Sequence, residues 1–496
     1  MSRAPVISSE ARAGRGVEGA PLPTRSAPRS LFAAADATFL SREAAKALTD
    51  RVLGMSTSDD TRVNVTSGWA GNTRFAGGEI TTSGGVTDTT VTVTCTVGRK
   101  RASASTNVLD DVSLQRTVDT AMLLARLSPD DAELMPELGP QAYTPVNSFI
   151  DKTAELTPEA RATAVKAVLA GAASGSNNLK DLFAAGFLDA RAGVGAIATG
   201  KGLFAYHRQT SVDLSTTVRT PDGTGSGWAS GGARDWSLLD PAALGRVAAR
   251  KAVASRLPQA IEPGMYTVVL EPQAVADLIP QLAVGFNARS ADEGRSPFSK
   301  RGGGTKLGEK IMDERVTLLS DPADPDLLAQ PYDGEGLPVK ERVWIENGVL
   351  KNLSYSRYWA QKQGKEATGG GGGGAGGFGG GVGGGLPGGL KMVGGTKSTD
   401  ELIAGTERGI LVTHFFYIRS LDQRTVMLTG LTRDGTFLIE KGKVTRALKN
   451  FRWNESPLLM LGKLDELGRA ERTATGQVMP SLRVRDFNFT SLSDAV

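Results

Sequence analysis

The chain has 496 residues, of which 40% are hydrophobic and 22% are charged, so it is long enough for two or three domains with cores of their own. Its 57 basic and 53 acidic residues are interspersed and leave a net charge of +4, so we expect no nucleic-acid partner. A single cysteine excludes an internal disulfide, and no apolar run is long enough to span a bilayer, so we expect a cytoplasmic protein with no membrane partner.

The N-terminal part of the sequence predicts a tail followed by a small domain. Residues 1–30 are rich in Arg, Ser, Ala and Pro and lack the apolar core of a secretory signal, so we expect a disordered tail. An α+β domain over 31–135 follows. Within it, 41–55 begins with a favourable N-cap and is predicted to be helical. Valines that alternate with threonines over 91–97 predict a half-buried strand, and a second helix is expected over 110–127.

A proline-containing linker over 136–146 leads to a middle domain, predicted over 147–257. This domain combines helices with a meander of short strands. Its first helix begins with Thr-Pro-Glu, which supplies an N-cap, a proline that suits the first turn, and an acidic residue. The expected elements are a helix over 157–172, strands over 194–199, 203–209 and 212–219, and a helix over 240–257.

The C-terminal part, 264–496, begins with a strand that runs directly into a helix. Residues 266–270 form a short β-branched run. Apolar side chains then recur at three- and four-residue spacing over 272–286, which predicts a helix with one packed face. Pro280 removes a backbone hydrogen bond, so we expect it to bend the last turn.

The rest of this part is predicted to be rich in strands. Sixteen of the twenty-one residues over 369–389 are glycine, so we expect a mobile Gly-rich loop. From Leu411 onward, short apolar segments separated by turns predict an antiparallel sheet or barrel, with an amphipathic helix over 458–467. The predicted fold class is therefore α+β, with an N-terminal α+β domain, a middle helix-plus-meander domain and a C-terminal β-rich domain.

A series of short motifs follows the first strand of the C-terminal part. They are SPFS at 296–299, LGE at 307–309, VTLLSDP at 316–322, YDGEG at 332–336, WIENGVL at 344–350, STDELI at 398–403, LTG at 428–430 and LIEKGKV at 438–444. No single motif is specific. Their order and spacing over more than two hundred residues resemble the TldD/PmbA family, also called TldD/TldE, whose catalytic members are zinc peptidases.

This resemblance implies that the helix over 272–286 is a pseudo-active-site helix. The catalytic members carry His-Glu-x-x-x-His there, whereas Gln281, Leu282 and Phe286 stand at the three functional positions of this chain. The family's late cysteine ligand is also missing from 473–479. Independently of the family, catalytic zinc takes three protein ligands, and this chain has only two histidines and one cysteine, each in a different predicted domain. We therefore expect no metal and no cofactor in this chain.

Three further residues are kept as possible groove contacts. Asp333 and Glu335 lie in a turn-rich loop, where carboxylates are usually just solvated. The resemblance places this loop close to the family's cleft. His414 lies in a predicted strand among aromatic residues, where a packed histidine is the simpler interpretation.

The resemblance implies the non-catalytic TldE-like (PmbA) role, as the partner of a TldD-type zinc metallopeptidase that processes peptides. Zinc is then expected only in the TldD-type partner of a heterodimer, and a homo-oligomer is the alternative assembly. Two other functions stay open. One is a stand-alone enzyme without zinc chemistry, with Asp333, Glu335 or His414 as acid/base groups. The other is a binding or scaffold protein, in line with the family's description as a modulator of DNA gyrase.

Overall fold

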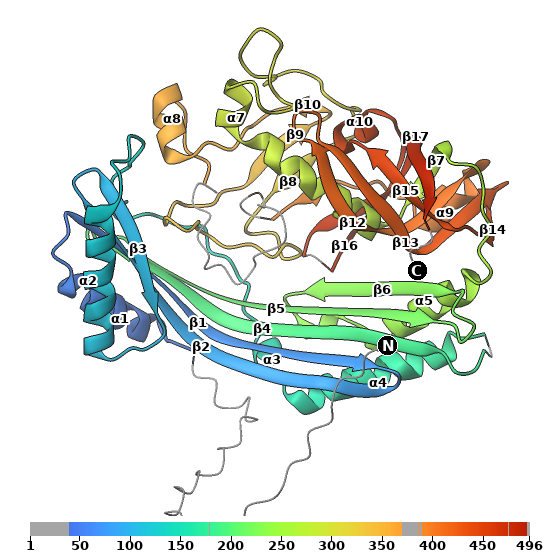
Figure 1. Ribbon diagram of the computed structural model, residues 1–496, viewed down its shortest axis with the longest axis horizontal. Helices are drawn as coiled ribbons and strands as arrows, with labels where there is room; N and C mark the ends of the chain where they lie inside the picture. The colour runs from blue at the N-terminus through green and yellow to red at the C-terminus, as the bar shows by residue number, and fades with distance from the viewer. Residues whose placement is uncertain (1–38, 178, 370–385, 387–388, 475, 494–496) are drawn as a thin grey trace, which may run out of the picture.

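The computed structural model describes residues 39–177, 179–369, 386, 389–474 and 476–493. Figure 1 shows a long curved sheet with helices on its outer side and a second β-rich unit over its other side. This arrangement confirms the predicted α+β class. The tail predicted over 1–30 lies outside the described residues, and so does most of the glycine tract predicted as a mobile loop over 369–389.

The curved sheet has six antiparallel strands in the order β3-β2-β1-β4-β5-β6. In its centre β1 pairs with β4, and Arg62 lies opposite Thr199. The predicted linker over 136–146 lies between these two strands in sequence, so the predicted N-terminal and middle domains share one sheet. The strands are β1 (Asp60–Ala76), β2 (Glu79–Val97), β3 (Lys100–Thr106), β4 (Phe183–Thr199), β5 (Phe204–Arg219) and β6 (Ser226–Ala233).

Helices cover one face of this sheet because alternate strand residues on that face are apolar. In β1, Val63 packs with α1 and α2, whereas Trp69 packs near α4 and α5. The longer helices begin where the sequence predicts, with Ser41, Asp110, Thr157 and Asp240 as side-chain N-caps. The helices of this part are α1 (Arg42–Met55), α2 (Asp111–Leu127), α3 (Asp151–Ala154), α4 (Pro158–Ser174), η2 (Trp236–Leu238) and α5 (Pro241–Ala254).

Two predicted features of the strand pattern are wrong. The segments expected as separate strands over 203–209 and 212–219 form one strand, β5, because Thr210 continues the extended chain and its N–H donates to Ser148 O at 2.8 Å. The helix predicted over 458–467 is shorter. It ends at Gly462, and the residues from Leu464 onward pair with β17 as a strand.

The second unit is built on an eleven-stranded sheet that partly closes on itself. The path β17-β15-β13-β12-β7 returns to β17, because β7 pairs with both β12 and β17. The predicted antiparallel sheet or barrel is therefore a five-stranded ring with extensions. The strands are β7 (Gly264–Leu270), β8 (Leu318–Ser320), β9 (Arg342–Glu346), β10 (Val349–Leu350), β11 (Lys391–Met392), β12 (Arg408–Asp422), β13 (Met427–Glu440), β14 (Lys443–Ala447), β15 (Asn450–Glu455), β16 (Leu464–Arg472) and β17 (Val478–Ser493).

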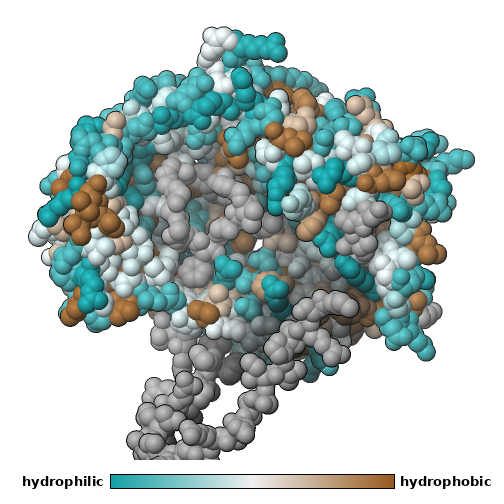
Figure 2. Space-filling model, in the orientation of Figure 1, coloured by the Kyte–Doolittle hydropathy of each residue, from teal (hydrophilic) through white to brown (hydrophobic). Residues whose placement is uncertain are grey.

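The second unit also contains short helices, and one of them, α6, directly follows β7. They are α6 (Pro272–Leu278), η3 (Ile279–Phe286), α7 (Ala288–Asp292), α8 (Arg357–Gln363), α9 (Thr399–Ala404) and α10 (Pro457–Gly462). None of the described helices has the length and hydropathy to cross a membrane. In the view of Figure 2 the apolar side chains that reach the surface form small separate groups on a mainly hydrophilic face.

Candidate functional site

The helix predicted over 272–286 changes its geometry halfway. It is an α-helix only from Pro272 to Leu278 and continues as the 3₁₀-helix η3 from Ile279. Pro280 lies at the start of η3 and has no N–H to donate to the preceding turn, which accounts for the loss of the α-helical pattern. The bend expected at Pro280 is therefore a change of helix type.

Two of the three pseudo-active-site residues belong to the hydrophobic core of the second unit. Leu282 is 0% exposed and Phe286 is 1% exposed, and the ring of Phe286 lies 4.9 Å from Phe298 and 5.4 Å from Trp344. Gln281 is half-buried. The apolar spacing placed Leu282 on the packed face of the predicted helix, and the structure adds Phe286 to the core.

These three positions do not fit zinc. A leucine and a phenylalanine have no atom that coordinates a metal, and both side chains here are enclosed by apolar neighbours. Only the Gln281 amide would be left as a donor. Across the described ranges, no three His, Cys, Asp or Glu side chains gather as a possible metal-binding group.

A buried carboxylate lies one turn before Gln281. Asp277 accepts hydrogen bonds from Gln273 Nε2 at 2.9 Å and from Phe415 N at 2.8 Å. Burial raises the pKa of Asp277, while the nearby charge of His414 opposes that rise. Phe415 belongs to β12, and the preceding residue of that strand, His414, therefore also lies near Asp277.

His414 forms the centre of a polar contact between the two sheets. Its Nε2 lies 3.1 Å from Asp434 Oδ2, its Nδ1 lies 3.2 Å from Phe415 O, and its ring stacks on Trp228 at a centroid distance of 4.5 Å. Ser226 Oγ donates a hydrogen bond to Asp434 Oδ1. Because Ser226 and Trp228 come from β6, His414 from β12 and Asp434 from β13, this group joins the curved sheet to the second unit. We call Ser226, Trp228, Asp277, His414 and Asp434 the junction cluster.

The carboxylate of Asp434 finds hydrogen-bond partners within the junction cluster. Burial alone would raise the pKa of Asp434, but hydrogen bonds from His414 and Ser226 outweigh burial and lower that pKa below its ordinary value. Both ring nitrogens of His414 face oxygen acceptors, so the ring donates to both only when it carries both protons.

The order of contacts in the junction cluster does not suit nucleophilic catalysis. A serine nucleophile needs an imidazole to take its proton, with the carboxylate behind the imidazole. Here the carboxylate of Asp434 lies between Ser226 and His414. His414 is also only 9% exposed, so the cluster offers little access to a substrate. This geometry favours a structural role for His414.

The loop with the other two candidates docks on the opposite end of the curved sheet. Asp333 Oδ1 accepts from the N–H groups of Glu335 and Leu337 at 2.9 and 3.0 Å, which is turn chemistry. Glu335 pairs with Arg357 at 3.3 Å. Burial, and then the charge of Asp333, raises the pKa of Tyr143 to about 12, so its hydroxyl keeps its proton and donates to Gly336 O.

The structure does not bring the three possible groove contacts together. Gly336 lies against Leu203, at the beginning of β5, whereas Trp228 of the junction cluster lies opposite Thr217, near the end of β5. Fourteen residues of extended chain correspond to roughly 45 Å. Asp333 and Glu335 therefore belong to a different place from His414.

A further pair of carboxylates on the curved sheet escaped the sequence reasoning. Asp189 and Asp213 lie opposite each other on β4 and β5, and Asp189 pairs with Arg191 at 2.6 Å. Burial, and then the charge of Asp189, raises the pKa of Asp213 to about 7. In the sequence, each of these residues appears only as a carboxylate within a strand pattern. That Asp189 lies opposite Asp213 depends on the register between two strands, which the sequence of one strand does not show.

Asp277 and Asp434 were also missed, although each left a trace in the sequence. Asp277 stands within the apolar periodicity of the predicted helix, one turn before Gln281. Asp434 precedes Gly435 in what reads as a turn, but it lies inside β13 with a positive φ of 53°. Their contacts join segments more than a hundred residues apart, which local patterns do not encode.

Comparison with protein families gives two matches that together cover most of the chain. The PmbA/TldA metallopeptidase central domain matches residues 151–256, and the PmbA/TldA metallopeptidase C-terminal domain matches residues 263–491. The corresponding predicted domains are 147–257 and 264–496.

Curated relatives carry metalloprotease names. Metalloprotease PmbA of Escherichia coli O157:H7 is 24% identical over 66% of this chain and 73% of its own length. A metalloprotease of Methanothermobacter thermautotrophicus is 34% identical over 35% of this chain. The chain spans only about two fifths of the length of that relative, and 24% of an uncharacterized Methanocaldococcus jannaschii protein to which it is 36% identical.

Solved structures share the whole fold. A crystal structure of a modulator of a DNA gyrase from Thermotoga maritima superposes with a TM-score of 0.78 at 20% identity, covering 90% of this chain and 100% of that one. TldE from Thermococcus kodakarensis gives a TM-score of 0.76 at 18% identity, covering 91% of this chain and 100% of that one. At sequence identities of 18–20% these structures show only that the fold is shared. The family is shown by the two domain matches. The chain belongs to the PmbA/TldD metallopeptidase family.

Proposed function

We propose that this chain is the non-catalytic, TldE-like subunit of a zinc metallopeptidase complex that processes peptides. The observation that carries the proposal is the packing of Leu282 and Phe286 in the core, at the positions where the resemblance aligns the catalytic His-Glu-x-x-x-His motif. Side chains that fill the core at two of the three motif positions leave the peptidase chemistry to another subunit. The fold, shared over 91% of this chain with a protein named TldE, supports the same role.

In this proposal the zinc and the water that it activates belong to a TldD-type partner. The residues of this chain supply a stable wall beside that site, because η3 keeps its place through the apolar contacts of Phe286 and through Ser296 Oγ, which donates to Gly285 O at 2.6 Å. Peptides would then be bound by both subunits and cleaved by one of them.

The test is reconstitution with a TldD-type subunit. We expect the isolated chain to bind less than about 0.1 zinc per molecule and to cleave no peptide. Mixing with the partner is expected to give peptidase activity that a chelator removes, and native mass spectrometry is expected to show a heterodimer. A partner whose motif glutamate is replaced by glutamine is the matched control and should stay inactive in the mixture.

Each alternative predicts a different result. Chelator-sensitive cleavage by the isolated chain would contradict the proposal, and cleavage that a chelator does not affect would favour a stand-alone enzyme without zinc. A homo-oligomer that neither binds the partner nor raises its activity would favour a binding or scaffold protein.

A further inference from the structure

One edge of the curved sheet is open over part of its length. The strand β5 pairs with β4 from Phe204 onward, but β6 joins its other side only from Val212 onward. Between these points the described residues supply a single bridge, from Ser148 to Gln209. The edge over 204–208 therefore has no neighbouring strand.

The main-chain groups of this edge point outward at even-numbered residues. Thr210 N donates to Ser148 O at 2.8 Å, and Arg208 O accepts from Ser148 Oγ at 3.0 Å, so these two residues face the open side. Alternation along an antiparallel strand turns Phe204 and Tyr206 the same way. Within the part of the chain that the structure describes, no hydrogen bond to the main chain of these two residues comes from that side.

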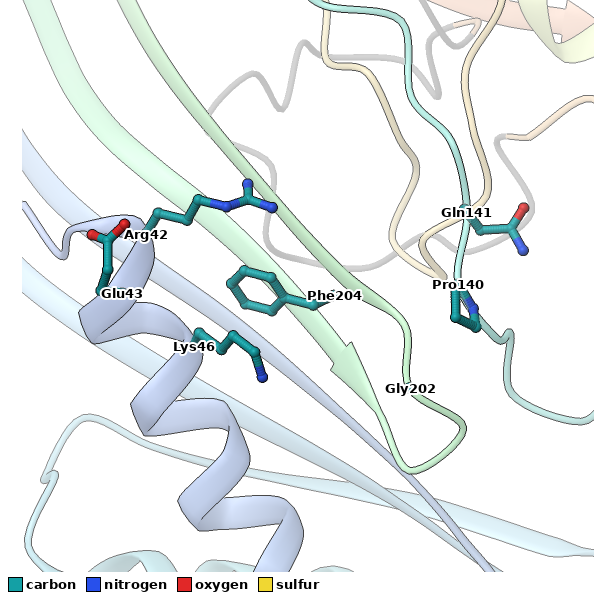
Figure 3. Close-up of a pocket in the computed structure, with 7 residues that line it drawn as sticks. All are labelled: Arg42, Glu43, Lys46, Pro140, Gln141, Gly202 and Phe204. Atoms are coloured by element: carbon teal, nitrogen blue, oxygen red, sulfur yellow. The ribbon is translucent and has the colours of Figure 1, made fainter.

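Two cavities lie along the open edge. The first has a volume of about 310 Å³ and lies between α1 and the segment at Pro140 and Gln141, with Phe204 at its floor (Figure 3). The second has a volume of about 370 Å³ and lies between 204–208 and 143–149. Both are lined by Arg42 and Phe204, so they are adjacent, and we call the two cavities together the β5 groove.

The β5 groove is lined by the cations of Arg42, Lys46 and Arg208 and by one carboxylate, that of Glu43. The Arg42 guanidinium lies 5.2 Å from the Phe204 ring centroid, and the Arg208 guanidinium lies 3.6 Å from that of Phe149. Among the described residues, neither guanidinium has an acidic partner within 4 Å. The nearby Glu43 turns away from Phe204 in Figure 3, and its pKa is lowered by backbone and side-chain hydrogen bonds at the start of α1.

We propose that the β5 groove binds an extended acidic peptide as an added strand. The N–H and C=O groups of Phe204 and Tyr206 would pair with the peptide main chain, and Arg42 and Arg208 would pair with its carboxylates. Five residues of β5 offer roughly 16 Å of edge, which matches about five residues of peptide. A free phosphate would satisfy the arginines but would leave the main-chain groups unpaired, so the observations favour a peptide.

This inference rests on the proposed peptide-handling function and deepens it, because it assigns the place on this chain and the charge of the ligand. The β5 groove lies at the Gly336 end of β5, far from the junction cluster. A peptide held there by strand addition would be kept extended before it reaches a partner's active site.

The test measures binding to the isolated full chain by fluorescence anisotropy. The probe is a labelled seven-residue peptide of alternating valine and glutamate, and the neutral probe has glutamine in place of glutamate. We expect the acidic probe to bind at least about tenfold more tightly, the equivalent of one charge-assisted hydrogen bond. Arg42→Gln and Arg208→Gln should each weaken binding about tenfold, while Arg424→Gln, at an exposed position on the second unit, should not change it.

A second pair of probes tests the strand pairing without altering the protein. One acidic peptide carries N-methyl groups on two valines and the other carries them on two glutamates, so that only one of them loses the N–H groups that face β5. We expect one to lose binding and the other to retain it.

Equal binding of both N-methylated probes, or unchanged binding by both arginine variants, would overturn the proposal. A dimer in sedimentation velocity that the peptide dissociates would also overturn it, since a second copy of the chain would then occupy the groove. Because no partner is present, a failure here leaves the reconstitution result untouched, and a failure of reconstitution leaves this measurement untouched.

Discussion

Leu282 and Val284 are two residues apart in η3 and differ completely in exposure, at 0% and 58%. This contrast gives a direct test of whether the pseudo-active-site residues are part of the core. Leu282→Glu would place an unpaired carboxylate among apolar side chains, so we expect a loss of unfolding free energy of about 3 kcal/mol or more. Urea denaturation followed by circular dichroism measures it.

Val284→Glu is the matched control in the same helix. It introduces the same charge at an exposed position, where the expected change is within about 0.5 kcal/mol. If the two variants lost equal stability, the helix would tolerate charge poorly everywhere, and core packing at Leu282 would not account for the loss.

Asp213 predicts a pH dependence of stability. Its pKa of about 7 in the folded chain is raised from an unfolded value of about 3.9, so folding favours the protonated form. The stabilisation is fully present below about pH 4 and is lost as pH rises through 7. We expect the free energy of unfolding of the wild type, relative to Asp213→Asn, to fall by a few kcal/mol between pH 5 and pH 8.

The measurement is urea denaturation of both proteins at pH 5, 6, 7 and 8. Asp422→Asn is a suitable control, because this carboxylate is exposed and its pKa is lowered by hydrogen bonds from Thr425 and Arg424. A constant difference between wild type and Asp213→Asn over this range would mean that Asp213 is ionised in the fold throughout.

Among the elements, α4 and α5 cross closely because glycines stand at the contact. A Cβ at Gly245 would lie 2.0 Å from Val168 O, and one at Gly171 would lie 2.1 Å from Ala242 O. Gly245→Ala would force the two helices apart, so we expect it to destabilise the chain by roughly 1–3 kcal/mol.

Gly54 of α1 provides the opposite expectation. A Cβ there meets nothing within 4 Å, so Gly54→Ala is expected to raise stability by up to about 1 kcal/mol through helix propensity. The melting temperatures of the Gly245→Ala and Gly54→Ala proteins, compared with that of the wild type, test both expectations. A Gly245→Ala protein that melts at or above the wild-type temperature would show that the helices can separate without cost.

The same elements show what the sequence could and could not predict. Helices with a side-chain N-cap, such as those that begin after Ser41 and Thr157, were predicted to within one or two residues, because capping and apolar spacing are local. The strand predicted over 91–97 is only the last part of β2, whose earlier residues are mainly Thr, Ser and Gly and carry little hydrophobic signal. The type of helix at η3 was not predicted, since Pro280 indicated only a bend.

At the scale of the whole molecule, the junction cluster predicts energetic coupling between the two units. Ser226 lies on β6 and Asp434 on β13, and their hydrogen bond is buried. In a double-mutant cycle of Ser226→Ala and Asp434→Asn we expect a coupling free energy of about 1–2 kcal/mol. Urea denaturation of the four proteins measures it.

The control cycle pairs Ser226→Ala with Asp422→Asn, at the exposed end of β12, and should be additive within about 0.5 kcal/mol. Additivity in the first cycle as well would show that the hydrogen bond between the sheets contributes nothing to stability. The other contacts of the cluster, including the stacking of Trp228 on His414, would then have to hold the units together.

The candidate site shows the limit of sequence reasoning at this scale. The family motifs identified Gln281, Leu282 and Phe286 as a set because they lie on one short helix. Asp333 was kept because the resemblance places its loop near the family's cleft, and His414 for its chemistry, and the fold places the two residues at opposite ends of β5. The distance between two such residues depends on the tertiary packing of the whole chain, and the local periodicity of the sequence contains no information about it.

The pairing of β1 with β4 also has a consequence for how the chain is made. Arg62 is synthesised well before its partner Thr199, so β1 cannot pair with β4 until the ribosome has made residue 199. Ribosomes add about 5–20 residues per second, so the interval between the two strands is on the order of ten seconds. During translation β1 therefore has an open inner edge long after β2 and β3 have emerged, and such an edge can pair with any extended chain nearby. A rearranged chain in which the β4 segment is encoded directly after β1 would shorten this interval and lower the contact order of the sheet.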